Sequence, residues 1–192
     1  MTPHGSEEPL IVAQSSKVTL ENPEYLEKHL FCMTAITTDV LEIVDIDEER
    51  ESVKVKLKLP DKFLNEVSNE FGSHAVLINA GPFLEKMEQV SYEHGLHLIK
   101  GLVDYEDFNI NYSSRIHSFN EGNPSLFLKK EKYFEYQNEF RLVVLNGEAE
   151  EDGHFELEID GLNELLTVVS IDTFLNSEME FNLKLQKDNK ED

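Results

Sequence analysis

The sequence predicts an α+β fold, with a mixed, mostly antiparallel sheet and two or three helices packed on it. Helical patterns lie mainly in the first half of the chain, whereas the alternation of apolar and polar residues that is typical of half-buried strands dominates the second half. Of the 192 residues, 40% are hydrophobic, which is enough for one core of ordinary size. We therefore expect a single domain over residues 1–186, followed by a disordered tail over residues 187–192.

Three helices are predicted in the first half of the chain. Asn22 and Pro23 mark the start of the first helix, within residues 21–30, because Asn is a preferred N-cap and Pro fits the first helical position. The second helix follows a proline and covers residues 61–72, with one apolar face. The third covers residues 81–95, with a proline near its start and a glycine at its end.

The clearest strand pattern is the segment 52–60, which alternates aliphatic residues with Lys54, Lys56 and Lys58. One face of this strand should lie on the core, and the lysines can pair with acidic residues of neighbouring strands. The first strand of the chain is apolar enough to be buried on both faces, which would also bury Cys32. The strands expected in this half are residues 30–37, 40–46, 52–60, 74–80 and 96–105.

In the second half, residues 107–125 are rich in Asn and Ser and predict a long loop. A long strand is predicted at 132–145, joined through a turn to a hairpin partner at 154–159. The acidic residues of this partner strand should face solvent. They are Glu156, Glu158 and Asp160. A short helix at 160–166 and strands at 167–171 and 179–185 complete the predicted elements.

Net charge is the strongest compositional signal, at −22 from 39 acidic and 17 basic residues. A field of this size repels nucleic acid and anionic membranes and attracts basic protein surfaces. Residues 146–192 hold 14 Asp and Glu and three Lys, so about a quarter of the chain carries half of the charge. The pattern is typical of a solubilising surface or of an acidic docking face, and it predicts a basic protein partner.

Several motifs that identify common enzyme classes are absent from the sequence. It contains no P-loop, no GxGxxG fingerprint, no GxSxG elbow and no pair of cysteines for a zinc site. His94 and His97 are close in sequence, but they straddle a predicted helix end, so we expect no metal site. The N-terminus lacks a secretory pattern and no apolar run reaches about 18 residues, which predicts a soluble, cytoplasmic protein.

One polar row is the candidate site. If the segment "KYFEYQNEFRLVV" (132–144) is a strand, alternate residues lie on one face, about 7 Å apart. A carboxylate between an amide and a guanidinium can be held ionised and aimed at a ligand. The same row can instead form an ion-pair ladder with the lysines of segment 52–60. The members of the row are Glu135, Gln137, Glu139 and Arg141.

The residues "YQNEF" resemble the Gln-x-Glu motif of ADP-ribosyltransferases. The resemblance implies that Glu139 stabilises the oxocarbenium ion formed from the ribose of NAD and that Gln137 helps to bind the acceptor. Arg115 and Arg141 are then the main candidates to bind the phosphates of NAD.

A broader resemblance covers roughly residues 70–170. It rests on the order of "FGSHAVLIN", "GLVDYED" and "FLKKEKYFEYQNEFRLVV", and it is to a family of uncharacterised bacterial and phage-associated proteins with a Tyr-x-x-x-Gln-x-Glu-Phe-Arg signature. The resemblance implies a microbial origin and a shared fold. The positions that carry it are Tyr133, Gln137, Glu139 and Arg141.

Three functions agree with these observations. The first is an acidic, non-enzymatic protein-binding module without a cofactor, an inhibitor or immunity-type protein, for example in antiphage defence, that occludes a basic partner that handles nucleic acid. The alternative is an ADP-ribosyltransferase-like enzyme that uses NAD, with Glu139 as its key carboxylate. A structural subunit of a larger assembly is the third. The burial of Glu139 helps to separate these readings, because an ionised carboxylate is buried only with partners.

Overall fold

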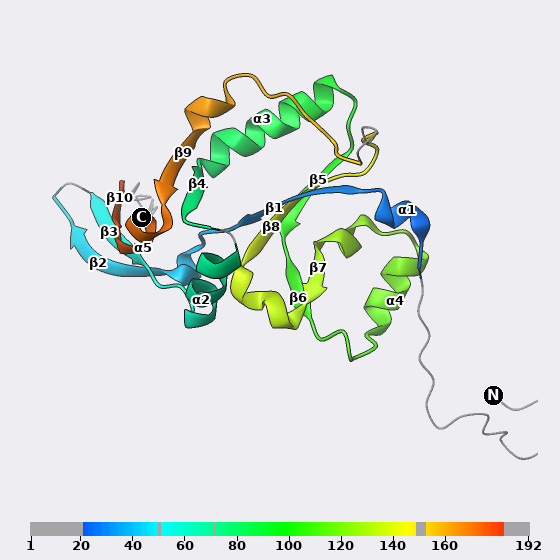
Figure 1. Cartoon of the computed structure of the whole chain (residues 1–192), viewed down its shortest axis with the longest axis horizontal. Helices are drawn as coiled ribbons and strands as arrows, with labels where there is room; N and C mark the ends of the chain where they lie inside the picture. Colours follow the sequence, from blue (N-terminus) through cyan, green and yellow to red (C-terminus); the bar gives the residue numbers. More distant parts are fainter. Residues whose placement is uncertain (1–20, 50, 71, 149–152, 183–192) are drawn as a thin grey trace, which may run out of the picture.

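The computed structural model describes residues 21–49, 51–70, 72–148 and 153–182. The fold is α+β with mostly antiparallel strands, which confirms the predicted class (Figure 1). The strands within these ranges are divided among four sheets, three antiparallel and one formed by a parallel pair. Within the described ranges, no helix is long and apolar enough to cross a membrane. The predicted tail at 187–192 lies outside these ranges.

The described residues contain helices, short 3-10 segments and strands. The helices are α1 (Pro23–Leu26), α2 (Asp61–Glu70), α3 (Ala80–Glu93), α4 (Ser113–Asn120) and α5 (Ile171–Asn176). Short 3-10 segments are η1 (Thr38–Val40), η2 (Pro124–Leu128), η3 (Lys132–Gln137) and η4 (Leu162–Leu165). The strands are β1 (His29–Thr34), β2 (Leu41–Asp47), β3 (Ser52–Leu57), β4 (His74–Ile78), β5 (Leu98–Leu102), β6 (Asp104–Glu106), β7 (Lys129–Glu131), β8 (Glu139–Val144), β9 (Leu166–Ser170) and β10 (Glu178–Asn182).

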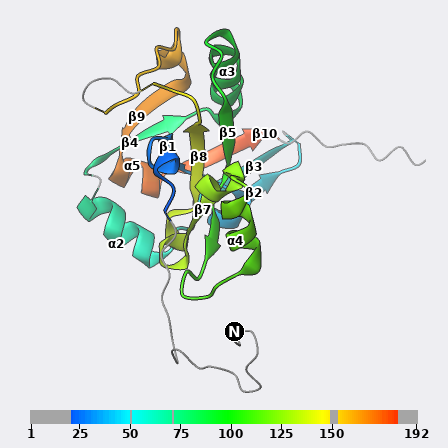
Figure 2. The same ribbon diagram turned by 90° about the vertical axis from the view of Figure 1, so that its right-hand side faces the viewer.

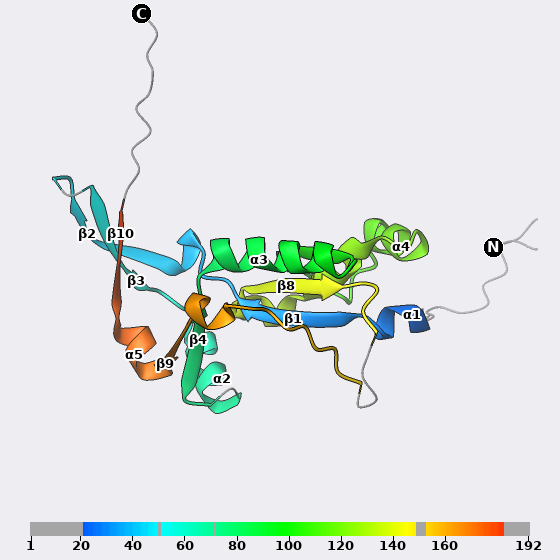
Figure 3. The ribbon, with the colours of Figure 1, turned by 90° about the horizontal axis from the view of Figure 1, so that it is seen from above.

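The central sheet has the order β1-β8-β5, with both neighbours antiparallel to β8 (Figure 2). Because β8 is the middle strand, two of its apolar residues are the most buried among the described residues, with Leu142 2% and Val143 0% exposed. On one face, α3 runs alongside β8 and packs Phe83 and Met87 against Leu142 (Figure 3). This contact is the main hydrophobic core.

The opposite face of the central sheet is covered by the segment between β6 and β8. Leu128 in η2 lies so close to Gly101 in β5 that a Cβ at this glycine would be 2.9 Å from its Cδ1. Tyr25 of α1 contacts Phe119 and Phe127 edge-on, each with 5.5 Å between ring centroids. These aromatic contacts hold down a segment that contains α4 and η2, so the predicted loop at 107–125 is partly helical.

The first strand of the chain is more exposed than predicted. β1 lies at the edge of the central sheet and pairs only with β8 among the described strands. Phe31 is 52% exposed, and Cys32 is also an exposed residue. The prediction that this strand is buried on both faces was therefore wrong, because Phe31 and Cys32 point to opposite faces of the strand and solvent reaches both of them from the open side of the edge strand.

The predicted hairpin between 132–145 and 154–159 does not form. Both edges of β8 are occupied by β1 and β5, which leaves no edge for a further strand. Residues 154–159 have no regular secondary structure, but their alternation holds: Phe155 stacks on His29 with 5.0 Å between ring centroids, whereas Leu157 and Ile159 pack against the core. A side chain at Gly147 would clash with Phe155, since a Cβ there would be 2.8 Å from its ring.

A second antiparallel sheet, with the order β10-β3-β2, projects from the body of the molecule, and we call it the arm (Figure 1). Lys54 lies opposite Asp45 of β2 and Glu180 of β10, and Lys56 lies opposite Glu42 and Glu178. Lys56 Nζ is 3.6 Å from Glu42 Oε2. The lysines of segment 52–60 that lie in β3 thus face acidic neighbours, as predicted, but these neighbours are not the residues of the 135–141 row.

Candidate functional site

The polar row of segment 132–144 is not the face of one strand. Residues 132–137 form η3, Asn138 has a left-handed backbone with φ 43°, and β8 begins only at Glu139. Asn138 favours this conformation more than most residues do, and its side-chain Nδ2 donates to Ala35 O at 2.5 Å. The turn therefore changes the direction of the chain between Gln137 and Glu139, and the prediction of a continuous strand at 132–145 was wrong.

Glu139 is the only charged side chain among the described residues that is buried, at 6% exposed. Its Oε1 accepts from Arg141 Nε at 2.5 Å, and its Oε2 accepts from Lys130 Nζ at 2.5 Å. Lys130 Nζ also donates to Gln137 Oε1 at 2.5 Å. Both oxygens of the buried carboxylate are thus bound by cations of the same chain, and we call these four residues the Glu139 cluster.

Electrostatics keep Glu139 ionised. Burial on its own raises the pKa of a carboxyl group, but hydrogen bonds from Arg141, Lys130 and the thiol of Cys32 outweigh burial and lower the pKa of Glu139 below its usual value. Cys32 lies directly opposite Arg141 across the β1-β8 pair. Although the residue as a whole is exposed, partial burial of its thiol and the hydrogen bond to Glu139 raise the pKa of Cys32 to about 11, so the thiol stays protonated at neutral pH.

Neighbouring elements hold the cluster in place. Arg141 Nη1 donates to Phe127 O at 2.7 Å, which ties the guanidinium to η2. The backbone N–H of Glu139 donates to the hydroxyl of Tyr105 in β6 at 2.8 Å, and burial raises the pKa of this tyrosine. The cluster therefore joins β1, β6, β7, β8 and the 3-10 segments η2 and η3 around one carboxylate.

A second ion cluster lies on the other side of β7. Glu106 accepts from Arg115 Nη1 at 3.2 Å and from Lys129, and Lys129 Nζ also binds Asp104 at 2.9 Å. Although burial opposes its charge, these hydrogen bonds raise the pKa of Lys129. Because residues alternate along β7, Lys129 and Lys130 bind different clusters. Arg115 therefore does not contact Glu139.

The structure brings together three of the predicted site residues, Gln137, Glu139 and Arg141. Glu135 is exposed and lies outside the cluster. Tyr133 is 59% exposed and its ring lies 3.3 Å from Lys62 Nζ of α2, in a cation–π contact. The predicted ladder between this row and the lysines of segment 52–60 is also wrong, because those that lie in β3 face β2 and β10.

Sequence reasoning missed Lys130, Cys32 and Tyr105. Lys130 stands in "FLKKEK", seven residues before Gln137, and a lysine near a Gln-x-Glu-x-Arg segment is a weak signal for a counter-ion. No local pattern points to Cys32 or Tyr105, since they approach Glu139 only through the pairing of β1 with β8 and the position of β6.

The predicted acidic face lies on the opposite side of the central sheet, next to α3. Its residues Glu156, Glu158 and Asp160 are exposed, although their segment is not a strand. Between this segment and α3 lies a shallow hollow of about 190 Å³. The hollow is lined by Lys86, Gln89, Val90, Glu93, His94, Glu158 and Asp160.

The two regions differ in what they can do chemically. The Glu139 cluster is closed by its own ion pairs, whereas the acidic segment 154–160 offers charge to solvent. Among the described residues, no group of three or more His, Cys, Asp and Glu side chains could hold a metal ion. Comparison of the chain with protein families, with curated proteins and with solved structures found no match.

Proposed function

We propose that this protein is a non-enzymatic, acidic protein-binding module, an inhibitor or immunity-type protein that occludes a basic partner that handles nucleic acid. One observation carries the proposal: the buried Glu139 is neutralised by Lys130 and Arg141 of its own chain, while Glu156, Glu158 and Asp160 are exposed. The buried carboxylate of Glu139 thus forms ion pairs that stabilise the fold, whereas the exposed acidic side chains are free to contact a partner protein.

The surface composition also supports a binding role. Among the described residues, ten hydrophobic side chains are buried and 17 large hydrophobic side chains are exposed. Large apolar areas left in water are typical of proteins that use them to bind other proteins. Together with the net charge of −22, this surface suits a partner that is basic and partly apolar.

The test is a pull-down with the tagged full chain at about 50 mM and about 500 mM NaCl, where the screening length falls severalfold. The triple variant E156Q/E158Q/D160N is compared with E21Q/E24Q/E27Q, which removes the same charge from exposed positions at α1. We expect a captured basic protein whose recovery falls at high salt and falls in the first variant only. Capture that is insensitive to both salt and the triple variant, or no captured protein, would overturn the proposal.

A second candidate is an ADP-ribosyltransferase-like enzyme that uses NAD. It is favoured by one observation, that Gln137 and the ionised Glu139 share Lys130 in one cluster. A thermal-shift titration with NAD tests it, because a ligand that binds only the folded protein raises Tm with concentration. We expect no NAD-dependent rise if the protein is a binding module. A rise in the wild type that is absent in E139Q and in Q137A would favour the enzyme instead.

A further inference from the structure

The arm has one apolar and one charged face. Residues that lie opposite each other on neighbouring antiparallel strands point to the same side of a sheet. Val55 lies opposite Ile43 and Met179, and Val53 lies opposite Ile46 and Phe181. These six side chains form what we call the arm face. The other side carries Lys54 and Lys56 with their acidic neighbours.

A β-bulge aligns the two isoleucines on this face. The register of β2 against β3 shifts between Ile43 and Asp45, so Val44 is the extra residue. Without the bulge, strict alternation would place Ile43 and Asp45 on the same side and Ile46 on the charged side. The bulge therefore collects both isoleucines on the apolar face. It also interrupts the free edge of β2, which disfavours the addition of another strand there.

The arm face is open to solvent along its two edge strands, β2 and β10. Ile43 is 62% exposed, Ile46 54% and Phe181 47%, whereas Val55 at the centre is 5% exposed. A sheet of three strands normally needs its apolar face packed against another layer to be stable. At the base of the arm, the row of Val53 and Val55 continues to Leu57. This leucine lines a hollow of about 430 Å³ between β3, α2 and α5, together with Leu59, Leu64 and Leu175.

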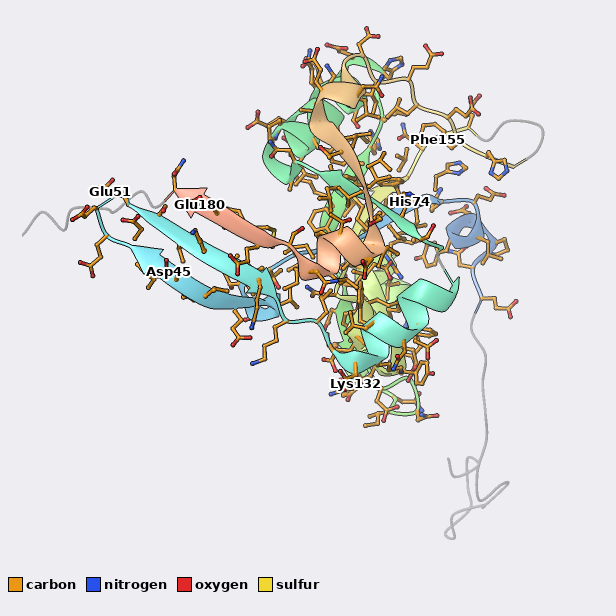
Figure 4. The ribbon with its side chains drawn as sticks, turned by 60° about the vertical axis from the view of Figure 1, so that its left-hand side comes forward. Asp45, Glu51, His74, Lys132, Phe155 and Glu180 are labelled. Carbon is orange, nitrogen blue, oxygen red and sulfur yellow. The ribbon has the colours of Figure 1, made fainter. Side chains whose placement is uncertain are left out.

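Charge around the arm face indicates the kind of partner. The described residues of the arm and its turn carry eight carboxylates and two lysines. Four of these carboxylates lie opposite Lys54 and Lys56 on the other side of the sheet, whereas Glu48, Glu49 and Glu51 lie in the turn at the end of the arm face. Figure 4 shows Glu51 at the outer end of the arm, with Asp45 and Glu180 on its two edge strands. A second copy of the chain would bring like charges together around the same face, whereas a partner with basic groups would be attracted.

We propose that the arm face is a docking surface for a protein partner that presents an apolar centre surrounded by Lys and Arg. This inference rests on the proposed function, because it names a surface and a partner chemistry for the same binding role. It places apolar recognition on the arm, apart from the exposed acidic segment 154–160. The isoleucines and Phe181 supply the buried centre of the contact, and the acidic turn between β2 and β3 supplies the rim.

The test uses two synthetic peptides as probes, one that alternates Lys with Val and Leu and one that keeps the lysines but has Ser at every apolar position. Binding to the full-length protein is measured by fluorescence anisotropy at about 150 mM NaCl, where long-range attraction between exposed charges is largely screened. The arm variant is I43S/I46S. Its matched control is V76S/V168S, which removes two apolar side chains that are 54% and 67% exposed on the β4-β9 pair.

We expect the Lys/Val/Leu peptide to bind the wild type and V76S/V168S equally, and to bind I43S/I46S about tenfold more weakly or worse, since two apolar contacts are lost. The Lys/Ser peptide should bind all three proteins equally weakly. Tm values within a few degrees of the wild type show that the variants are folded.

Three results would overturn the inference. Equal binding of both peptides to all three proteins would mean that charge alone drives binding. This result would refute the arm face as a docking surface but would not contradict the proposed acidic function. Absence of binding by the Lys/Val/Leu peptide would mean that the face is unsuited to such a partner, and the pull-down then tests the proposed function separately. Sedimentation as a dimer by the wild type but as a monomer by I43S/I46S would assign the face to a second copy of the chain.

Discussion

Replacing Glu139 by Gln removes the charge at the centre of the Glu139 cluster and preserves the size of the side chain. The side chains of Lys130 and Arg141 are only 24% and 12% exposed, so both cations would remain largely out of water without a counter-ion. Removal of one partner from a buried ion pair costs about 3–5 kcal/mol. We expect about 3 kcal/mol here, the lower end of that range, because Lys130 keeps some solvent and its bond to Gln137. In a chain of this size, that loss lowers Tm by about 6–12 °C.

The assay is urea unfolding followed by circular dichroism, together with a thermal scan. The matched control is Glu135→Gln, an exposed carboxylate of η3, for which we expect a change within about 0.5 kcal/mol. If the Tm of E139Q stays within about 2 °C of that of the wild type, the cations do not depend on Glu139. The reasoning on the cluster would then be refuted.

The pH dependence gives a second readout of the same residue. The folded pKa of Glu139 is lowered from the ordinary value of 4.5, so its stabilising effect is fully present above that pH and is lost as pH falls through the folded pKa. The difference in unfolding free energy between the wild type and E139Q should therefore be constant at neutral pH and shrink as the pH falls below 4.5. A difference that is unchanged in acid would mean that the carboxylate does not act through its charge.

Three further predictions concern single residues. Because the pKa of Cys32 is raised to about 11, iodoacetamide should alkylate it up to about 100-fold more slowly than free cysteine at about pH 8. Alkylation should be faster in E139Q than in the wild type, and equal rates in the two proteins would contradict the contact of Cys32 with Glu139. Leu142→Ala should lower the free energy of unfolding by about 3–5 kcal/mol, measured with urea, whereas Leu26→Ala at an 83% exposed site should lower it by less than about 0.5 kcal/mol. Similar losses in the two variants would mean that Leu142 is not in the core. Asn138→Ala should lower the free energy of unfolding by about 2 kcal/mol, because the hydrogen bond to Ala35 is lost and alanine is strained in the left-handed backbone conformation. An unchanged urea midpoint of unfolding would contradict the turn at Asn138.

Local pattern predicted burial better than it predicted strand pairing. In the segment 154–159, the alternation of Phe155, Leu157 and Ile159 with acidic residues is present although the segment is not a strand. The reason is that the alternation records which side chains avoid water, and an extended coil can satisfy it as well as a strand. The hairpin prediction was wrong because it required an edge of β8, and that edge depends on where β1 and β5 pack.

The candidate site shows the same division. Gln137, Glu139 and Arg141 were predicted together from their spacing, and they do meet, but through a turn at Asn138 instead of along a strand. The counter-ion Lys130 had only a weak local signal, and the contacts of Cys32 and Tyr105 had none, since these residues lie about 107 and 34 positions before Glu139 in the chain. Their approach results from strand order, which no local periodicity encodes.

The sequence by itself determined the α+β class, most of the strands and helices, the acidic charge and three of the four residues of the Glu139 cluster, because these follow from periodicity, caps, spacing and composition. The tertiary structure alone decided that Glu139 is buried and held by two cations, that β8 is a central strand, and that the apolar face of the arm is open. These outcomes depend on contacts between segments that are far apart in the chain. Such contacts stabilise the protein only after the strands have paired in their final order.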